Sequence, residues 1–363
     1  MKKTDQNNKL QINDELIDNI INLIDNSDNK RILKNFNELH HADIAEILEE
    51  LTSDQATYII KLLDSEKTSD ILMELDDDDR ERILNNLSAK EIAEEVEELD
   101  TDDATDIISE LPEERQKRVI SKIEDKEHKA DIKELLKYDE DSAGGLMAKE
   151  LVKVNENWSV TRCVKEMRSQ ASEVTRVHSV YVVDNNDKLL GRLSLKDLLV
   201  ANPKSNIKAI YISKVDFVNV NDSGEHVASI MQKYDLGAIP VVDNKQKLLG
   251  RITIDDIVDL IKEEAEKDYQ LAAGITQDVD VDDSIYKLSW ARLPWLFLGL
   301  LGGIGAAAVM GGFEEILMKY KILFYFTPLI AAMAGNVGVQ SSAIIVQGLA
   351  NDDIKDSINN RLF

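Results

Sequence analysis

The 363-residue sequence holds a single cysteine, Cys163, and far fewer basic than acidic residues. One cysteine excludes an intrachain disulfide and a zinc site built on cysteines, and it suits a reducing compartment. The formal net charge of -26 argues against nucleic acid as a partner, because phosphate binding needs clustered Lys and Arg. The amino-terminal stretch MKKTDQNNKLQIND lacks an apolar core, so we expect no cleaved signal peptide.

Charge is unevenly distributed along the chain. Hydrophobic residues make up 43% of the sequence, which is ordinary for a globular protein. Nearly all charged residues precede the apolar segment that begins at Leu293, which indicates a soluble part followed by a membrane part. The acidic excess is compatible with cation binding, although an acidic surface that keeps the protein soluble explains it as well.

Residues 1–137 contain a leucine that recurs every twelve residues. Most of these leucines follow an apolar pair, such as Ile59 and Ile60, by three and four residues, so they share one helical face. Because a two-turn helix cannot bury its apolar stripe alone, the units are expected to stack into an acidic α-helical superhelical solenoid. The recurring positions are Leu39, Leu51, Leu63, Leu75, Leu87, Leu99, Leu111 and Ile123.

The acidic residues of this solenoid are of several kinds. Asp76 to Asp79 lie where carboxylates favour the dipole of a helix N-terminus. Asp102 and Asp106 are spaced to share a helix face, where like charges cost stability unless a cation or a partner intervenes. Glu95 departs from the repeat, since it stands where the first residue of an apolar pair is expected.

Residues 138–200 and 201–261 form two copies of one motif. YVVDNNDKLLGRLSLKDLLV (181–200) and PVVDNKQKLLGRITIDDIVD (240–259) share a buried strand, a turn, a second strand and an Asp near the start of a helix. A further helix precedes each copy, at 159–170 and 223–233. The pattern predicts a pair of α/β domains, and Gly144 and Gly145 mark the break between solenoid and pair.

Residues 255–273 predict a connecting helix, with Gly274 as its C-cap. Its acidic faces include Asp256 and Asp259, three residues apart, and Glu264 and Asp268, four apart. Mg²⁺ prefers carboxylate oxygens together with retained waters, so these side chains are candidate cation ligands. The solvated face of a linker helix is the alternative.

Two charge-free stretches, 293–313 and 322–350, are long enough to cross ~30 Å of hydrocarbon. Arg292 agrees with the positive-inside rule, so we expect a multi-pass plasma-membrane protein with its amino-terminal domains in the cytoplasm. Amides in the second stretch are expensive in hydrocarbon unless they face a partner or water. This predicts a pore-lining helix, or else a polar seam that packs helices together; the candidate pore residues are Gly335, Asn336, Gly338 and Gln340.

The tandem motif resembles a pair of CBS domains, which usually bind nucleotides or ions between the copies and can also serve only as a dimerisation scaffold. The whole order of segments resembles the MgtE magnesium channels of bacteria. RLPWL and FEEIL surround the first span, and Pro328 precedes the motif GNVGVQ (335–340). The resemblance covers nearly the whole chain, although Ala334 stands where the family often has Gly.

The resemblance implies a homodimer in membrane lipid, with a cation pore at the twofold axis and the connecting helix as a plug. High cytosolic Mg²⁺ would close the pore by bridging carboxylates, so Mg²⁺ is expected to be both regulatory and transported. Adenine nucleotide is a candidate ligand of the CBS pair, and Lys267 stands where the family can have an acid. The matching metal positions are Asp102 and Asp106 in the solenoid, Glu225 and Asp235 in the second CBS copy, and Asp256, Asp259, Glu264 and Asp268 on the plug.

The family has five spans per subunit, and this sequence ends after two, so we expect a fragment or a truncated chain. An enzyme is not expected, because no nucleophile elbow, phosphate loop or His–acid constellation appears. Two alternatives remain. One is a membrane-tethered CBS regulator that senses nucleotide without transporting, and the other is an acidic solenoid adaptor, which leaves the amides of the second stretch without a purpose.

Overall fold

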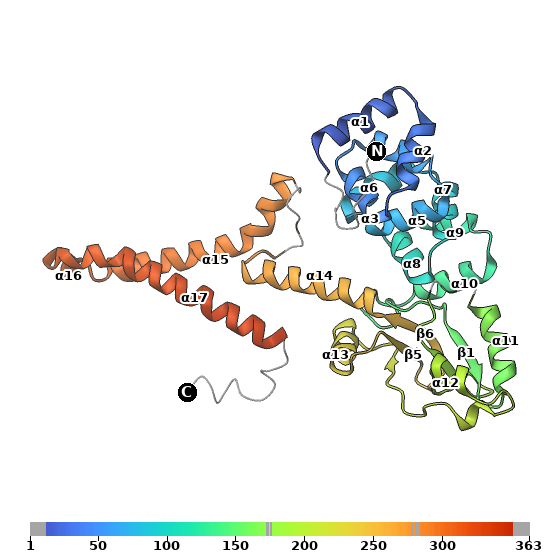
Figure 1. Ribbon diagram of the computed structural model, residues 1–363. Helices are drawn as coiled ribbons and strands as arrows, with labels where there is room; N and C mark the ends of the chain where they lie inside the picture. Colours follow the sequence, from blue (N-terminus) through green and yellow to red (C-terminus); the bar gives the residue numbers. More distant parts are fainter. Residues whose placement is uncertain (1–11, 172–173, 175, 277–278, 280–283, 351–363) are drawn as a thin grey trace. The chain divides into compact units, whose positions relative to one another are not determined.

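The computed structural model describes residues 12–171, 174, 176–276, 279 and 284–350 (Figure 1). The expectations for the amino-terminal stretch before residue 12 and for the end of the chain after residue 350 lie outside these residues. The chain divides into two compact units, residues 1–257 and 258–363, and each is described by itself.

The first part of the first unit is a run of ten short helices between residues 12 and 137. Their N-caps are mostly Asp, Ser and Thr; at α7, for example, the Ser88 hydroxyl accepts a bond from the Glu91 N–H, and the Glu91 carboxylate accepts one from the Ser88 N–H. The helices are α1 (Asp14–Asp25), α2 (Asn29–Asn37), α3 (His41–Glu49), α4 (Ser53–Ile60), α5 (Ser65–Glu74), α6 (Asp77–Asn86), α7 (Ala89–Val96), α8 (Thr101–Ser109), α9 (Glu113–Lys122) and α10 (Lys126–Leu135).

From α3 on, most of these helices pack mainly on the next but one, whereas α1 packs mainly on α2. Helix α3 contacts α5, α5 contacts α7 and α7 contacts α9, while α4 contacts α6 and α8 contacts α10. One continuous apolar core runs through the stacked helices, and the apolar pairs of the repeat are buried in it. Side chains also join successive turns, as where Arg115 of α9 donates to the carbonyls of Leu84 and Leu87. The predicted solenoid is confirmed.

The second part of the first unit is a pair of small α/β domains. In each copy the first strand is parallel to the second, and the second is antiparallel to the third. The first copy holds β1 (Val152–Asn155), α11 (Val160–Gln170), β2 (Val180–Val183), β3 (Leu189–Leu193) and α12 (Leu195–Val200). After a 3₁₀ turn η1 (Ile207–Ala209), the second copy holds β4 (Val218–Asn219), α13 (Gly224–Tyr234), β5 (Ala238–Val242) and β6 (Leu248–Thr253), and α14 (Ile254–Ala272) follows it.

The two copies repeat each other down to backbone details. The register of the antiparallel pair shifts at Val182/Val183 in one copy and at Val241/Val242 in the other. The turns also agree, with positive φ angles of 61° at Asp187 and 63° at Gln246. The copies meet at these turns, where Leu189 donates its N–H to Gln246 and Leu248 donates to Asp187, at 2.9 and 3.0 Å. The predicted tandem repeat is therefore a pseudo-symmetric pair.

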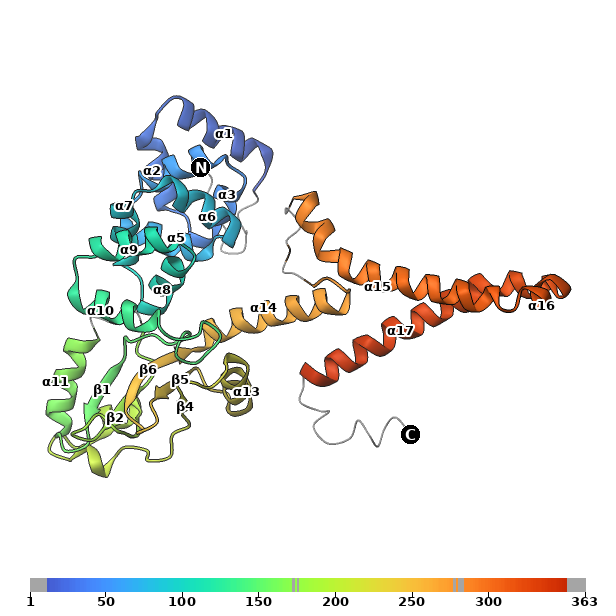
Figure 2. The same ribbon diagram turned by 180° about the vertical axis from the view of Figure 1, so that it is seen from behind.

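The segment between α10 and β1 lies against the second copy, although the sequence leads it into the first. The Ala143 N–H donates to the Asp222 carbonyl at 2.7 Å, and Ala148 exchanges two backbone bonds with Arg251. Gly144, which the sequence analysis placed at the break between solenoid and pair, is tightly packed, since a Cβ there would meet the Tyr138 ring at 2.6 Å. This segment thus fastens the solenoid to the second copy, and Figure 2 shows α8 and α10 as the solenoid helices beside the strands.

The glycine of the repeated KLLGR motif is needed because a second chain segment crosses each of these strands. A Cβ on Gly250 would lie 2.5 Å from the Ala148 carbonyl oxygen and 2.9 Å from the Met147 sulfur. Gly250→Ala is therefore expected to lower the free energy of unfolding by about 1–3 kcal/mol, measured by chemical denaturation. Gly237→Ala is the control, because a Cβ there meets nothing within 4 Å. Equal effects of the two substitutions would contradict this reading.

The second unit continues α14 and holds α15 (Ile285–Gly311), α16 (Glu314–Lys319), a 3₁₀ segment η2 (Lys321–Phe326) and α17 (Thr327–Ala350). Helix α15 begins ahead of the apolar run at Leu293, because Ser284 caps it by accepting the Lys287 N–H. Gly274 ends α14 with φ 77°, as expected of a C-cap glycine. By length and composition α15 and the described part of α17 are apolar enough to cross a membrane.

Candidate metal centre

Carboxylates converge where the N-terminus of α8 meets the segment 136–151 between α10 and β1, which we call the strap. Asp100 is the N-cap of α8, and its carboxylate pairs with the buried Arg251 of β6, Nη2 to Oδ2 3.0 Å. Asp102 follows in the first helical turn and is only 8% exposed. The turn is acidic because helix N-termini favour negative charge. This places two solenoid carboxylates against the second α/β copy.

Glu150 supplies the third carboxylate from the strap. Its Oε2 accepts the Thr101 hydroxyl at 2.8 Å and the Thr101 N–H at 3.1 Å, so it caps α8 from outside the helix. The Thr101 hydroxyl accepts the Lys149 N–H at 2.9 Å, and Arg251 donates Nε–H to the Glu150 carbonyl at 2.5 Å. These bonds hold the backbone around the cluster in place. An oxygen of each carboxylate lies close to the oxygens of the other two.

Asp100, Asp102 and Glu150 each offer an oxygen, and these three atoms lie within 4.8 Å of one another. Oxygen ligands at such spacing suit a hard cation such as Mg²⁺ or Ca²⁺, which is bound by a few carboxylates and completes its shell with water. Arg251 offsets part of the negative charge, and among the described residues its guanidinium bonds to the Asp100 carboxylate and the Glu150 carbonyl. The arrangement can therefore hold a divalent cation between α8 and the strap.

The electrostatics of the cluster are those of carboxylates short of counter-charge. Burial raises the pKa of Asp102 well above its usual range, and the charges of Asp103, Asp256, Asp100 and Glu150 raise it further. Burial and the charge of Asp256 raise the pKa of Asp103 to about 7. A cation placed among these groups would favour their ionised forms. The ionised carboxylates therefore repel one another unless a cation binds among them.

Asp256 belongs to the same electrostatic cluster from the start of α14. Its carboxylate accepts the Thr253 hydroxyl at 2.6 Å and the Thr253 N–H at 2.9 Å, which caps the helix. Burial raises the pKa of Asp256, and the two bonds from Thr253 partly oppose that rise. The predicted residues Asp102 and Asp256 are therefore brought close enough to act on each other.

The other predicted metal residues are placed differently. Asp106 keeps an exposed side chain; surrounding protein and the charges of Asp103 and Glu140 raise its pKa to about 8, although water screens part of this effect. Glu225 and Asp235 lie exposed at the two ends of α13 and are outside the described carboxylate cluster. Asp259, Glu264 and Asp268 lie on α14 in the second unit, where Glu264 pairs with Lys267 at 3.5 Å.

Two members of the cluster escaped the sequence analysis. Asp100 could have been found, because an Asp that precedes Thr101 and two more acids at a helix start signals an N-cap. Glu150 gave no such signal, since it meets α8 only through a contact across 49 residues. The predicted pore residues Gly335, Asn336, Gly338 and Gln340 all lie within α17 and are exposed in the second unit, so their role stays a prediction.

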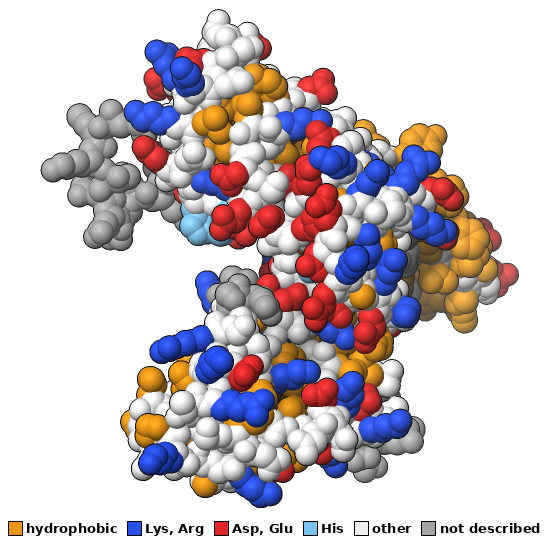
Figure 3. Space-filling model, turned by 90° about the vertical axis from the view of Figure 1, so that its right-hand side faces the viewer, with side chains coloured by type: hydrophobic (Ala, Val, Ile, Leu, Met, Phe, Trp, Pro, Cys, Tyr) orange, Lys and Arg blue, Asp and Glu red, His pale blue; other side chains and the backbone are white. Residues whose placement is uncertain are grey.

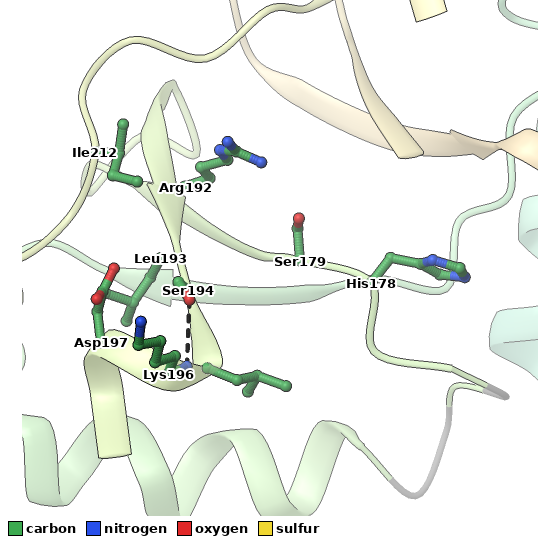
Figure 4. A pocket seen from close by; sticks show the side chains of 9 residues that line it. His178, Ser179, Arg192, Leu193, Ser194, Lys196, Asp197 and Ile212 are labelled. Atoms are coloured by element: carbon green, nitrogen blue, oxygen red, sulfur yellow. Dashed lines mark hydrogen bonds between the residues drawn. The ribbon is translucent and has the colours of Figure 1, made fainter. Parts of the chain in front are cut away.

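The first α/β copy carries a pocket of a different character. Its volume is 510 Å³, and its lining includes the ionisable groups His178, Arg192, Lys196 and Asp197 together with the hydroxyls of Ser179 and Ser194, so basic groups outnumber the single acid. Figure 4 shows these side chains around the end of β3, where the Ser194 hydroxyl accepts the Lys196 N–H at 3.2 Å. Figure 3 shows Lys and Arg mixed with Asp and Glu over the solenoid, whereas Lys and Arg outnumber the acids on the visible face of the α/β pair. The pocket suits an anion.

Protein-family comparisons match the solenoid and the α/β pair separately. Residues 39–141 match the MgtE intracellular N domain, and residues 143–204 and 207–263 match the CBS domain. The magnesium transporters MgtE of Enterococcus faecalis and Thermus thermophilus are 38% and 36% identical over 63% and 61% of this chain. These matches cover 50% and 49% of the two relatives, so the chain spans about half the length of the curated relatives that it matches.

Two solved structures are similar to the first part of the chain. The cytosolic domain of the Mg²⁺ channel MgtE in complex with ATP is 30% identical with a TM-score of 0.63, and the match covers 67% of this chain and 99% of that one. The soluble part of a magnesium transporter is 28% identical with a TM-score of 0.61, covering 69% and 98%.

The solenoid and the CBS pair together form the intracellular architecture of the family whose N domain they match, and two helices that are long and apolar enough to cross a membrane follow them. The chain belongs to the MgtE family. Its curated relatives are named as magnesium transporters, so this is a transporter family and not a family of enzymes.

Proposed function

We propose that this chain is the cytoplasmic sensor and the first membrane part of a transporter that imports Mg²⁺ across the plasma membrane. In this proposal Mg²⁺ bound at the cluster of Asp100, Asp102 and Glu150 favours a compact state in which the pore is closed. The three convergent carboxylates carry the proposal. The names of the relatives support the choice of Mg²⁺ over other hard cations.

The mechanism follows from the charge of the cluster. Buried carboxylates repel one another without a cation and are held together by one, so Mg²⁺ binds the compact state more tightly than an open one. Asp256 extends this cluster to the first turn of α14, the helix that runs on into the second unit. A cation that holds Asp256 near Asp102 would thus bias α14, which we propose to be the plug.

We propose a homodimer as the working form, with the CBS pair at its interface. The first copy presents two apolar side chains to solvent on α12, Leu199 at 84% and Val200 at 76% exposure. Side chains of this size on one short helix suit burial against a second copy. The proposed assembly also places two sets of α15 and α17 in one membrane, as a pore at a twofold axis requires.

Calorimetric titration of the chain with Mg²⁺ tests the sensor. We expect uptake at millimolar concentration and, in hydrogen exchange, slower exchange in α8, the strap and the first turn of α14. The absence of Mg²⁺ uptake would overturn the proposal. In the complete coding sequence, Asp256→Ala with Asp259→Ala should keep Mg²⁺ flux high when cytosolic Mg²⁺ is high, whereas closure as in the parent would refute the role of α14.

A second candidate function is nucleotide sensing, which the anionic-ligand pocket of the first CBS copy favours. Arg192 and Lys196 can contact phosphate oxygens, and the pocket volume of 510 Å³ accommodates a nucleotide. One relative of known structure is described in complex with ATP. Titration with ATP separates the two functions: protection confined to residues 178–197 without an effect of Mg²⁺ on α8 would favour a nucleotide-sensing regulator.

A further inference from the structure

Glu95 is an acid in the apolar core of the solenoid. The equivalent position in other units is aliphatic and fully buried, as at Ile83 and Ile107, and Glu95 itself is only 9% exposed. Its Oε2 is buried and has no hydrogen-bond partner among the described residues. Burying an unpaired carboxylate is costly, whereas the protonated acid is tolerated. The site therefore discriminates strongly between the two protonation states.

Every charge that acts strongly on Glu95 is negative. Glu91 and Glu94 lie on its own helix, Glu98 follows that helix, and Asp64 caps α5, which packs against α7. Burial and these charges together raise the pKa of Glu95 to about 8. Because these four neighbours are acids, none of them can offset the negative charge of an ionised Glu95. Protonation is the simplest way to neutralise it.

The nearby cations are held elsewhere. Lys61 pairs with Glu91 at 2.9 Å and Lys90 pairs with Glu94 at 2.6 Å. From α9, Arg115 is bonded to Asn85 and to two carbonyls. From α10, His128 is bonded through Nε2 to the Val96 carbonyl at 2.9 Å.

We propose that Glu95 is a proton-binding site that makes the α7 segment of the solenoid open as pH rises. Protonated Glu95 closes the core between α5 and α9, and its ionisation favours an opened α7 in which the carboxylate reaches water. Because α8 follows α7 directly, opening also disturbs the first turn of α8. Protons and Mg²⁺ then favour the same closed state, and this last step rests on the proposed function.

The sign of the effect follows from proton linkage. Glu95 holds its proton more tightly in the folded chain than in an opened one, so the closed state is fully favoured below pH of about 4.5 and loses stability up to about 8. The opening constant of α7 should rise about tenfold per pH unit in this range and level off above it.

Hydrogen exchange of the whole chain tests this, with labelling times adjusted for the intrinsic effect of pH. Between pH 6 and 8 we expect the opening constant of α7 to rise about fiftyfold in the parent, and by less than about threefold in Glu95→Leu and Glu95→Gln. Glu98→Gln is the control, since it removes a neighbouring exposed acid and should keep the parental slope. Equal slopes in the parent and in both Glu95 variants would overturn the proposal.

The link to Mg²⁺ has its own readout. At pH 8, Mg²⁺ should slow the opening of α7 in the parent, and Asp102→Asn should lose this effect while keeping the pH slope. If the pH slope is present but Mg²⁺ has no effect in the parent, the shared closed state is refuted while the proton site stands. If Mg²⁺ acts and the slope is absent, the proton site is refuted.

Discussion

Asp102→Asn is expected to weaken Mg²⁺ binding to the chain at least about tenfold, because Mg²⁺ affinity depends on the number of charged oxygen ligands. Asp102 is the most buried of the three clustered carboxylates, and its ligand oxygen lies within 4.8 Å of those of Asp100 and Glu150. Without Mg²⁺ the same variant should be more stable than the parent, since it removes a charge that burial and four neighbouring acids disfavour. Calorimetry gives the affinity, and denaturation in EDTA gives the stability.

Asp54→Asn is the matched control for this test. Asp54 is the second residue of α4, as Asp102 is the second residue of α8, but its side chain is exposed. We expect its loss to leave Mg²⁺ affinity within about twofold of the parent, because an exposed carboxylate binds Mg²⁺ weakly. If both variants lost affinity alike, general surface charge rather than the cluster would hold the ion. The assignment of the Mg²⁺ site to Asp100, Asp102 and Glu150 would then be wrong.

The solenoid could be predicted from sequence because its determinants are local. Leucines twelve residues apart and apolar pairs such as Ile59 and Ile60 fix both the period and the buried face of each helix. The packing of most helices on the next but one is not contained in that pattern. It depends on contacts between residues far apart in sequence, such as the bond from Asn86 of α6 to the Ser53 hydroxyl of α4.

The candidate site was only partly predictable for the same reason. The clustering of acidic residues indicated Asp102 as a cation ligand. The four-residue spacing predicted that Asp102 and Asp106 share one environment, but Asp102 is buried at the strap and Asp106 is exposed. Glu150 and Arg251 reach α8 across 49 and 151 residues. Only the docking of the strap on the second CBS copy brings them there, and no local pattern encodes that docking.

The two CBS copies illustrate how one sequence motif acquires two environments. Arg192 and Arg251 occupy the same position of the KLLGR motif in the two copies. Each lies in a strand that pairs antiparallel with the second strand of its copy. Arg192 lines an open pocket, whereas Arg251 is 5% exposed and bonded to Asp100 and to the Glu150 carbonyl. The solenoid and the strap therefore cover Arg251 in the second copy, whereas Arg192 stays exposed to solvent in the first.

Arg80→Ala should destabilise the solenoid by about 3–5 kcal/mol, the largest loss that we expect from a single charge. The Arg80 guanidinium is nearly buried; it bonds both carboxylate oxygens of Glu110 and donates to the carbonyls of Leu72 and Leu75. Its removal leaves Glu110 partly buried without its counter-charge, and leaves those carbonyls without their donor. Chemical denaturation measures the loss.

Arg82→Ala is the control for this substitution. Arg82 lies on the same helix and pairs with Asp79, but its side chain is 45% exposed, so its loss should cost less than about 0.5 kcal/mol. Arg80→Ala combined with Glu110→Ala should recover part of the loss, because the unpaired acid is then removed as well. A cost for Arg80→Ala as small as that for Arg82→Ala would mean that the helices α6 and α8 are held by apolar packing alone.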